Sequence, residues 1–104
     1  MKKDTMGIVH IDYESIMDEA KEITGNDRMK QYGHPKENFA HIASLWNSYL
    51  GNKGMLATGY LEAKDVALMM VLFKIAREQA GHKRDNLVDG AGYFRNAAQI
   101  EGIE

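Results

Sequence analysis

The amino-acid sequence predicts an all-α protein, a compact four-helix domain that assembles into a homo-oligomer. Apolar residues recur at helical spacing along the 104-residue chain, and no segment shows the strict alternation of a half-buried strand. Proline occurs once and glycine ten times, so helix breaks fall at a few defined places. Residues 66–73 are all apolar. These observations predict the fold class, the element boundaries and the assembly.

The first predicted helix covers residues 13–23, where apolar positions recur on one face. The Thr-Gly-Asn sequence at 24–26 ends it. A short turn of helix is expected at 27–31. Residues 1–12 are expected to form a flexible or loosely attached arm of the single domain, which spans residues 1–104.

The second predicted helix begins at Pro35, because a proline at the first helical position sacrifices no hydrogen bond. It ends at Gly51, and the glycine-rich residues 51–59 are expected to form a mobile loop. The third predicted helix covers residues 63–80. The fourth covers residues 85–100.

The third predicted helix gives the reason to expect an oligomer. Residues 66–73 cover its whole circumference with apolar side chains, and such a helix must be surrounded on every side. Three other helices in so short a chain cover one side of it. A second copy, most often related by two-fold symmetry, would cover the other, giving a dimer or higher homo-oligomer. The alternative is that this helix is simply central in a monomer.

Composition excludes several classes of protein. The chain is 44% hydrophobic and 27% charged, within the ordinary globular range. A net charge of −2 argues against a nucleic-acid partner, and the absence of cysteine excludes disulfides and thiolate metal sites. The longest apolar run has eight residues, too few for a membrane span. No apolar stretch follows the first basic residues, so a signal peptide is not expected. A cytoplasmic protein is expected.

Residues 32–39, Tyr-Gly-His-Pro-Lys-Glu-Asn-Phe, form the first candidate binding segment. They run into a helix start, where free N–H groups favour anions, and His34 and Lys36 would add positive charge. Tyr32 and Asn38 are further candidate contacts. The alternative is a plain turn and helix entry with Phe39 in the core.

Lys74 and Arg77 form the second candidate, directly after the apolar run and one helical turn apart. Long basic side chains at such a position commonly extend past apolar surface to reach solvent. They would also suit a phosphate at the edge of an apolar pocket, where the forked guanidinium of Arg77 matches the anion.

The fourth predicted helix holds the third candidate. One of its faces is expected to be a core stripe formed by Leu87, Ala91, Phe94 and Ala98. The opposite face carries Asp85, Asp89, Gly92 and Asn96. Two carboxylates at this spacing can share Mg²⁺ or accept hydrogen bonds from sugar hydroxyls. The alternative is an ordinary solvent-exposed face.

Gly90 and Gly92 each cost a helix on the order of 1 kcal/mol relative to alanine. The close approach of another backbone or of a ligand is the expected compensation.

Together these segments resemble an uncharacterised all-α family of tailed-phage and prophage proteins. Its signature runs Tyr-Gly-x-Pro-x-Glu-Asn-Phe, then Trp, Asp-Val-Ala, Lys-x-x-Arg and Asp-Asn-x-x-Asp-x-x-Gly-Tyr. The matching positions are residues 32–39, Trp46, residues 65–67, Lys74 with Arg77, and Asp85, Asn86, Asp89, Gly92 and Tyr93. The match covers residues 27–95. It departs from the pattern at Gly90, where a larger apolar residue is expected.

The pattern also looks like a looser relative of phage nucleotide-modification-associated domains. More distantly, the architecture is similar to the all-α nucleoside-triphosphate pyrophosphohydrolases, which hold Mg²⁺ with a Glu-Glu-x-x-Glu helix and a Glu-x-x-Asp helix. This chain lacks the first of these motifs, because Ala40 and His41 stand where an acidic partner of Glu37 would be. An Mg²⁺ site would therefore be short of ligands, which argues against an enzyme.

The resemblance and the residues together favour a binding protein that sequesters a nucleotide-derived ligand. The expected ligand is a host immune second messenger, captured in the cytoplasm of an infected or lysogenic bacterium, and no cofactor is expected. The expected ligand-binding residues are Tyr32, His34, Asn38, Trp46, Lys74, Arg77, Arg84, Asp85, Asn86, Asp89 and Tyr93. The aromatic members would stack a base, and the basic ones would neutralise phosphate.

Two alternatives stay open. One is an Mg²⁺-dependent nucleotide hydrolase, whose metal ligands would be Glu37, Asp65, Asp85 and Asp89. The other is a structural phage accessory protein, which would have no pocket.

Overall fold

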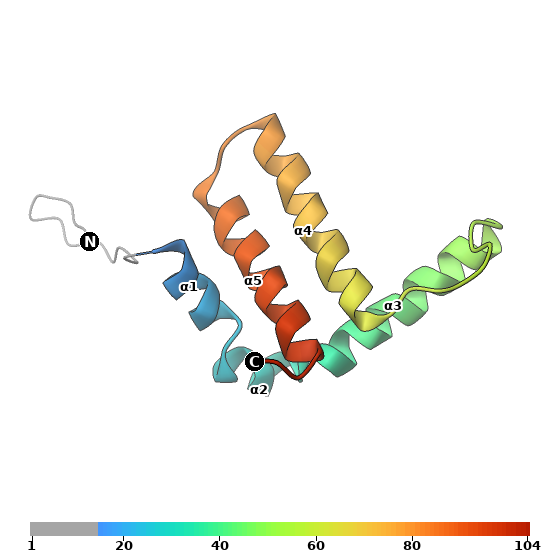
Figure 1. Ribbon diagram of the computed structural model, residues 1–104, viewed down its shortest axis with the longest axis horizontal. Coiled ribbons are helices and arrows are strands. Elements are labelled where there is room, and N and C mark those ends of the chain that lie inside the picture. Colours follow the sequence, from blue (N-terminus) through green and yellow to red (C-terminus); the bar gives the residue numbers. More distant parts are fainter. Residues whose placement is uncertain (1–14) are drawn as a thin grey trace, which may run out of the picture.

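The computed structural model describes residues 15–104, and within that range the chain forms five helices and no strand (Figure 1). The helices are α1 (Ile16–Ile23), α2 (Asn26–Tyr32), α3 (Pro35–Asn52), α4 (Ala63–Ala80) and α5 (Arg84–Ile100). The all-α prediction is confirmed. The expected arm at 1–12 and the expected helix start at residue 13 lie outside the described residues.

The predicted helix boundaries agree closely with the observed ones. The bounds of α4 and the start of α3 at Pro35 are as predicted, and α5 begins one residue earlier than predicted. The short turn expected at 27–31 is the complete helix α2. Proline, glycine and capping residues mark these ends because each has a fixed effect on the terminal hydrogen bonds of a helix.

Side-chain caps explain two of the helix starts. The Ser15 hydroxyl accepts a hydrogen bond from the Asp18 N–H at 2.9 Å and begins α1. At α4, the side chains of Glu62 and Asp65 each accept a hydrogen bond from the other's backbone N–H, which forms a capping box. Gly33 ends α2 at a φ of 87°, a conformation that favours glycine.

Helix α5 lies between α1 and α4 (Figure 1). α4 and α5 run antiparallel and are joined by a short turn, while the first half of α3 packs across the end of this pair. The second half of α3 projects away from the other helices, and residues 53–62 return along it. Asn47 holds this returning segment, since its amide donates to the Leu61 carbonyl at 3.0 Å and accepts from the Leu61 N–H at 2.7 Å.

The C-terminal end of α1 is held by side chains from α5. Arg95 donates to the Lys21 carbonyl at 3.1 Å and to the Thr24 hydroxyl at 2.9 Å, and Gln99 donates to the Thr24 carbonyl at 2.9 Å. The last carbonyls of a helix lack partners within the helix. Arg95 and Gln99 therefore satisfy groups of α1 that would otherwise need water.

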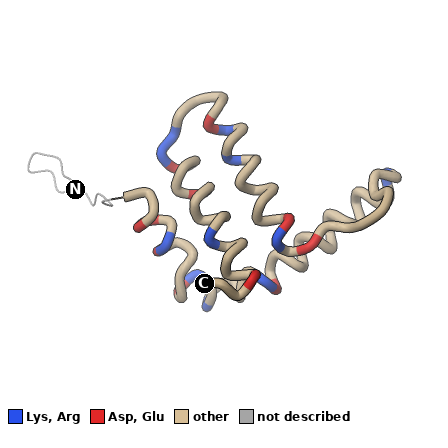
Figure 2. Tube along the Cα trace, in the orientation of Figure 1, with Lys and Arg blue, Asp and Glu red and all other residues tan. Residues whose placement is uncertain are grey.

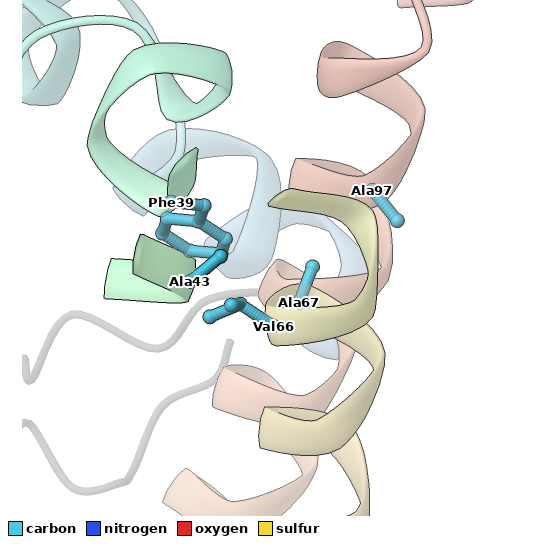
Figure 3. Packing of buried hydrophobic residues seen from close by; sticks show 5 residues of the cluster. All are labelled: Phe39, Ala43, Val66, Ala67 and Ala97. Atoms are coloured by element: carbon cyan, nitrogen blue, oxygen red, sulfur yellow. The ribbon is translucent and has the colours of Figure 1, made fainter. Parts of the chain in front are cut away.

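Small side chains form most of the core. The buried cluster joins Phe39 and Ala43 of α3 to Val66 and Ala67 of α4 and to Ala97 of α5 (Figure 3). Among residues 15–104 the largest side chains with almost no exposure are Val66 and Val88. Alanine and valine at these crossings allow the helix axes to approach closely, but they remove little apolar area from water.

The predicted core stripe of α5 is wrong. Leu87 and Phe94 are 44% and 58% exposed, whereas Val88 and Gly92 are buried. The reason is that α5 packs against α1 on one side and against α3 and α4 on the other, so the stripe occupies the remaining outer face. Periodicity identified an apolar face, but not the side on which the neighbouring helices lie.

Within residues 15–104, helix α4 is covered on one side only, as predicted from the apolar side chains around its whole circumference. Val66, Ala67 and Val71 are buried. Its outer side exposes Leu68, Met69, Leu72, Phe73 and Ile75. Assembly into a homo-oligomer stays a prediction. No helix of residues 15–104 is long and apolar enough to cross a membrane.

At Gly92 the structure shows the predicted close approach of another helix, because α1 packs against α5 there. A Cβ atom at this position would lie 3.4 Å from Thr24 Cγ2 and 3.5 Å from Ile23 Cδ1. At Gly90 the nearest atom to such a Cβ is Lys74 Cβ at 3.8 Å. Gly92 therefore sets the distance between α1 and α5, and Gly90 faces α4 less tightly.

We expect Gly92→Leu to lower the free energy of unfolding by about 1–3 kcal/mol, since the larger side chain must displace α1. Gly92→Ala is the control: its single methyl group would make ordinary contacts, and the gain in helix propensity is about 1 kcal/mol. Urea denaturation measures both. Equal stability of the two variants would contradict this account of the α1–α5 crossing.

Candidate functional site

A hollow of about 250 Å³ lies between the end of α1, α2, the start of α3 and α5. Its lining residues come from all four helices and from the turn at Gly33: Ile23, Thr24, Arg28, Met29, Tyr32, Gly33, Pro35, Asn38, Phe39, Tyr93 and Asn96. Segments that are far apart in the sequence therefore meet here. It is therefore a candidate ligand site.

Aromatic rings form the walls of the hollow. Phe39 is buried, and its ring centroid lies 6.4 Å from that of half-buried Tyr93 at an angle of 46°. Tyr32 is more exposed, and the Arg28 guanidinium carbon lies 5.2 Å above its ring. Arg28 and Tyr32 are four residues apart on α2, the spacing that places side chains together on one helix face.

Polar side chains complete the lining. The Thr24 hydroxyl donates to the Ala20 carbonyl at 2.7 Å, so it is already committed to the end of α1. Asn96 donates to the Gln99 side chain at 2.8 Å, which leaves its own amide oxygen as an acceptor. Asn38 is half-buried in the first turn of α3. Two amides thus provide the hydrogen-bonding groups suited to the edge of a planar ligand.

The start of α3 is capped from within the chain. His34 Nδ1 accepts a hydrogen bond from the Lys36 N–H at 3.0 Å, and the His34 carbonyl accepts from the N–H groups of Glu37 and Asn38, each at 3.0 Å. These N–H groups were expected to attract an anion, but they already have partners. Arg28 is therefore the cationic side chain that lines the hollow.

The structure divides the predicted ligand-binding residues among several places. Tyr32, Asn38 and Tyr93 come together in the lining of the hollow. Trp46 packs against the core and does not line the hollow. His34 is exposed and caps α3.

The predicted basic and acidic residues lie mostly on α4 and α5, and none of them lines the hollow. Lys74 Nζ is 3.0 Å from Asp89 Oδ2, so these two residues form an ion pair between the helices. The guanidinium carbon of Arg77 lies 4.8 Å from the centre of the Phe73 ring. Lys74 is thus tied to α5, and exposed Arg77 covers an aromatic ring.

The remaining predicted residues lie near the start of α5. Arg84 forms an ion pair with Glu19 of α1, and Asp85 is exposed. Buried Asn86 donates to the Glu78 carboxylate of α4 at 3.1 Å. These contacts join helices to one another, and the structure alone assigns them no ligand.

The four carboxylates of the hydrolase alternative are spread over α3, α4 and α5. Asp65 belongs to the capping box of α4 and Asp89 pairs with Lys74, while Glu37 and Asp85 are exposed on α3 and α5. Within residues 15–104, no three or more His, Cys, Asp or Glu side chains are grouped so that they could hold a metal ion. The structure does not bring this set together.

Sequence reasoning missed Arg28, Thr24 and Asn96 as site residues. The spacing of Arg28 and Tyr32 is a signal that was present in the sequence. Asn96 lies on the face of α5 that carries the candidate carboxylates, whereas Thr24 gave no signal, and the two meet only through the packing of α1 on α5.

The fold and the hollow define a small all-helical protein with an aromatic-lined hollow and no grouped metal ligands among its described residues. More specifically, the chain belongs to the family described as a domain of unknown function (DUF6378), whose model matches residues 15–101. The expectation of a phage family is confirmed at this level. The proposed signature and the relation to nucleotide-modification domains stay predictions.

Two curated relatives are the gene 55 proteins of Mycobacterium phages D29 and L5. The first is 43% identical over 81 residues and the second 44% identical over 80 residues. These alignments cover 77% and 76% of this chain but 49% and 47% of the relatives. The chain thus spans about half the length of these relatives. No solved structure matches it.

Glu78 is the described residue whose ionisation the structure clearly shifts. Hydrogen bonds from His82 at 2.5 Å and from Asn86 at 3.1 Å hold the pKa of its carboxyl below the ordinary value of 4.5, and the Lys83 N–H at 3.2 Å adds to this effect. The carboxylate thereby joins the end of α4 to the start of α5.

The pKa of Glu78 is lower in the folded state than in the unfolded state. Its contribution to the stability of the fold is therefore fully present above the unfolded-state pKa, and it is lost as the pH falls through the folded-state pKa. We expect Glu78→Gln to flatten the fall in melting temperature as the pH drops below the ordinary carboxyl value of 4.5. Glu22→Gln, which removes an exposed carboxylate of α1, is the control. Identical pH profiles for Glu78→Gln and the unmodified protein would contradict this assignment.

Proposed function

We propose that this protein binds a nucleotide-like ligand and sequesters it without chemical change. The observation that carries the proposal is the hollow of about 250 Å³, in which Phe39, Tyr93 and Tyr32 supply aromatic surface and Arg28 supplies positive charge. Planar bases stack on such rings, at roughly 1–3 kcal/mol per base. A guanidinium matches phosphate in its forked geometry.

The size of the hollow favours partial enclosure of the ligand. Pockets that enclose a drug-sized ligand measure about 300–1,000 Å³, so about 250 Å³ suits a nucleobase better than a whole nucleotide. The base would lie against Tyr93 and Phe39, with the amides of Asn38 and Asn96 at its edge. The sugar and phosphate would extend toward Arg28.

Binding rather than hydrolysis is the better proposal, for a chemical reason. Hydrolysis of a phosphate chain needs grouped carboxylates to hold Mg²⁺, and the candidate carboxylates are dispersed. Sequestration needs only complementary surface and charge. Because the curated relatives are phage proteins, we propose that the ligand is a nucleotide messenger of host defence.

We expect Arg28→Ala to weaken binding by about 10- to 150-fold, since a hydrogen bond to a charged group contributes roughly 1.5–3 kcal/mol. Lys30→Ala is the matched control, because it removes a positive charge from the same helix outside the lining of the hollow. Calorimetric titration would use mononucleotides, cyclic nucleotides and ADP-ribose, each with and without Mg²⁺.

Failure of every nucleotide in this panel to bind would sink the proposal. Equal loss of affinity in both variants would show a general effect of charge and would also count against the hollow. Turnover of a nucleoside triphosphate that requires Mg²⁺ would favour the hydrolase alternative instead.

A further inference from the structure

A separate apolar groove of about 490 Å³ lies between α1, α4 and α5 in the described part of the chain. Its apolar lining includes Met17 of α1, Val71 and Ile75 of α4, and Leu87 and Phe94 of α5. It shares no lining residue with the hollow described above. The groove and the hollow are therefore separate surfaces.

Three polar residues of the groove, Lys74, Glu78 and Asn86, have partners within the chain. Lys74 forms its ion pair with Asp89, and Asn86 donates to Glu78. A polar ligand would have to compete with these contacts, whereas an apolar surface would not. The groove thus suits an apolar helix face better than a small polar molecule.

An apolar ridge lies beside this groove on the same chain. On α4, Asp65, Leu68, Leu72, Ile75 and Gln79 follow the alternating three- and four-residue spacing of a helix–helix seam. Its central members Leu68, Leu72 and Ile75 are exposed. Ile75 also lines the groove, so ridge and groove form one continuous apolar face, the α4–α5 face.

We infer that the α4–α5 face binds a second copy of this chain. A ridge with a groove beside it is self-complementary: a two-fold axis passing near Leu72 would pack the two α4 ridges against each other, so that each ridge also borders the groove of its partner. The two α4–α5 pairs would then form a four-helix arrangement. The large side chains that the single chain leaves in water would be covered there.

Charge favours an antiparallel arrangement of the two α4 helices. Residues 66–73 carry no charge, and Figure 2 shows this uncharged stretch between the charged ends of the helix. The N-cap and first turn carry Glu62, Lys64 and Asp65, with one negative charge in excess, and the last two turns carry Lys74, Arg77 and Glu78, with one positive charge in excess. An antiparallel pair places Asp65 near the partner's Arg77 end, whereas a parallel pair would bring the two Asp65 side chains together at a seam position.

Sedimentation velocity of the full chain at micromolar concentration is expected to show a dimer. Leu72→Glu should raise the dissociation constant of this dimer at least about 30-fold, because it places a charge in the centre of the interface. Leu45→Glu on the projecting half of α3 is the matched control. The two leucines are similarly exposed in the single chain, 63% and 57%, so the two changes should affect folding alike. Only Leu72 lies on the α4–α5 face, so only Leu72→Glu should affect assembly.

Disulfide trapping keeps the inference testable if Leu72→Glu fails to fold. The chain has no cysteine, so each introduced thiol can pair only with its copy on the partner. Under mild oxidation Leu72→Cys should form a disulfide-linked dimer, because position 72 lies near the middle of α4 and hence near the two-fold axis. Asp65→Cys, at one end of an antiparallel pair, and Leu45→Cys should not.

A linked dimer through Asp65→Cys would show a parallel arrangement and overturn the antiparallel one. If Leu72→Glu leaves the dimer intact and Leu72→Cys forms no disulfide link, the interface lies elsewhere on the chain. A stable monomer would end the inference. If removal of residues 1–14 then lowered its melting temperature, the face would be assigned to the chain's own first residues.

Discussion

The structure depends on the close approach of helices at small side chains. Ala20, Ala43, Ala67, Gly92 and Ala97 lie where helices pack against one another. Small residues bring helix axes near each other, but they contribute little apolar area. Many of the large apolar side chains therefore remain exposed, on the projecting half of α3 and on the outer face of α4 and α5. The same choice of small residues gives the single chain its shape and leaves its large side chains available for contacts beyond it.

The sequence predicted where helices begin and end far better than which of their faces are buried. Pro35, Gly81 and Glu62 act through local hydrogen bonds and dihedral angles, so their effect can be read from neighbouring residues. The orientation of α5 depends instead on helices that are distant in the sequence. Leu87 and Phe94 have the spacing of a core stripe. The faces of α5 that are covered are instead those of Ala97, against α4, and of Gly92, against α1. Periodicity alone cannot distinguish a buried apolar face from an exposed one.

The candidate site was predicted in part, for a related reason. Tyr32 and Asn38 belong to one short motif, and Tyr93 belongs to another, so their residue types singled them out before their positions were known. Their meeting in one hollow follows from the packing of α2 and α3 against α5. Lys74 and Asp89 drew attention for the same chemical reasons, yet they pair with each other. Charged residues signal both ligand contacts and ion pairs, and only the tertiary structure separates the two.

The attachment of α1 has a consequence for the order in which the protein is made. Its last turn is bound by Arg95 and Gln99, which follow their partners by more than 70 residues. A nascent chain is released from its N-terminal end, so α1 and the Tyr-Gly motif leave the ribosome well before the helix that holds them. The hollow cannot exist until α5 has emerged and folded back. The proposed ligand capture would therefore depend on α5, and a chain broken off before α5 would carry the motif without the hollow.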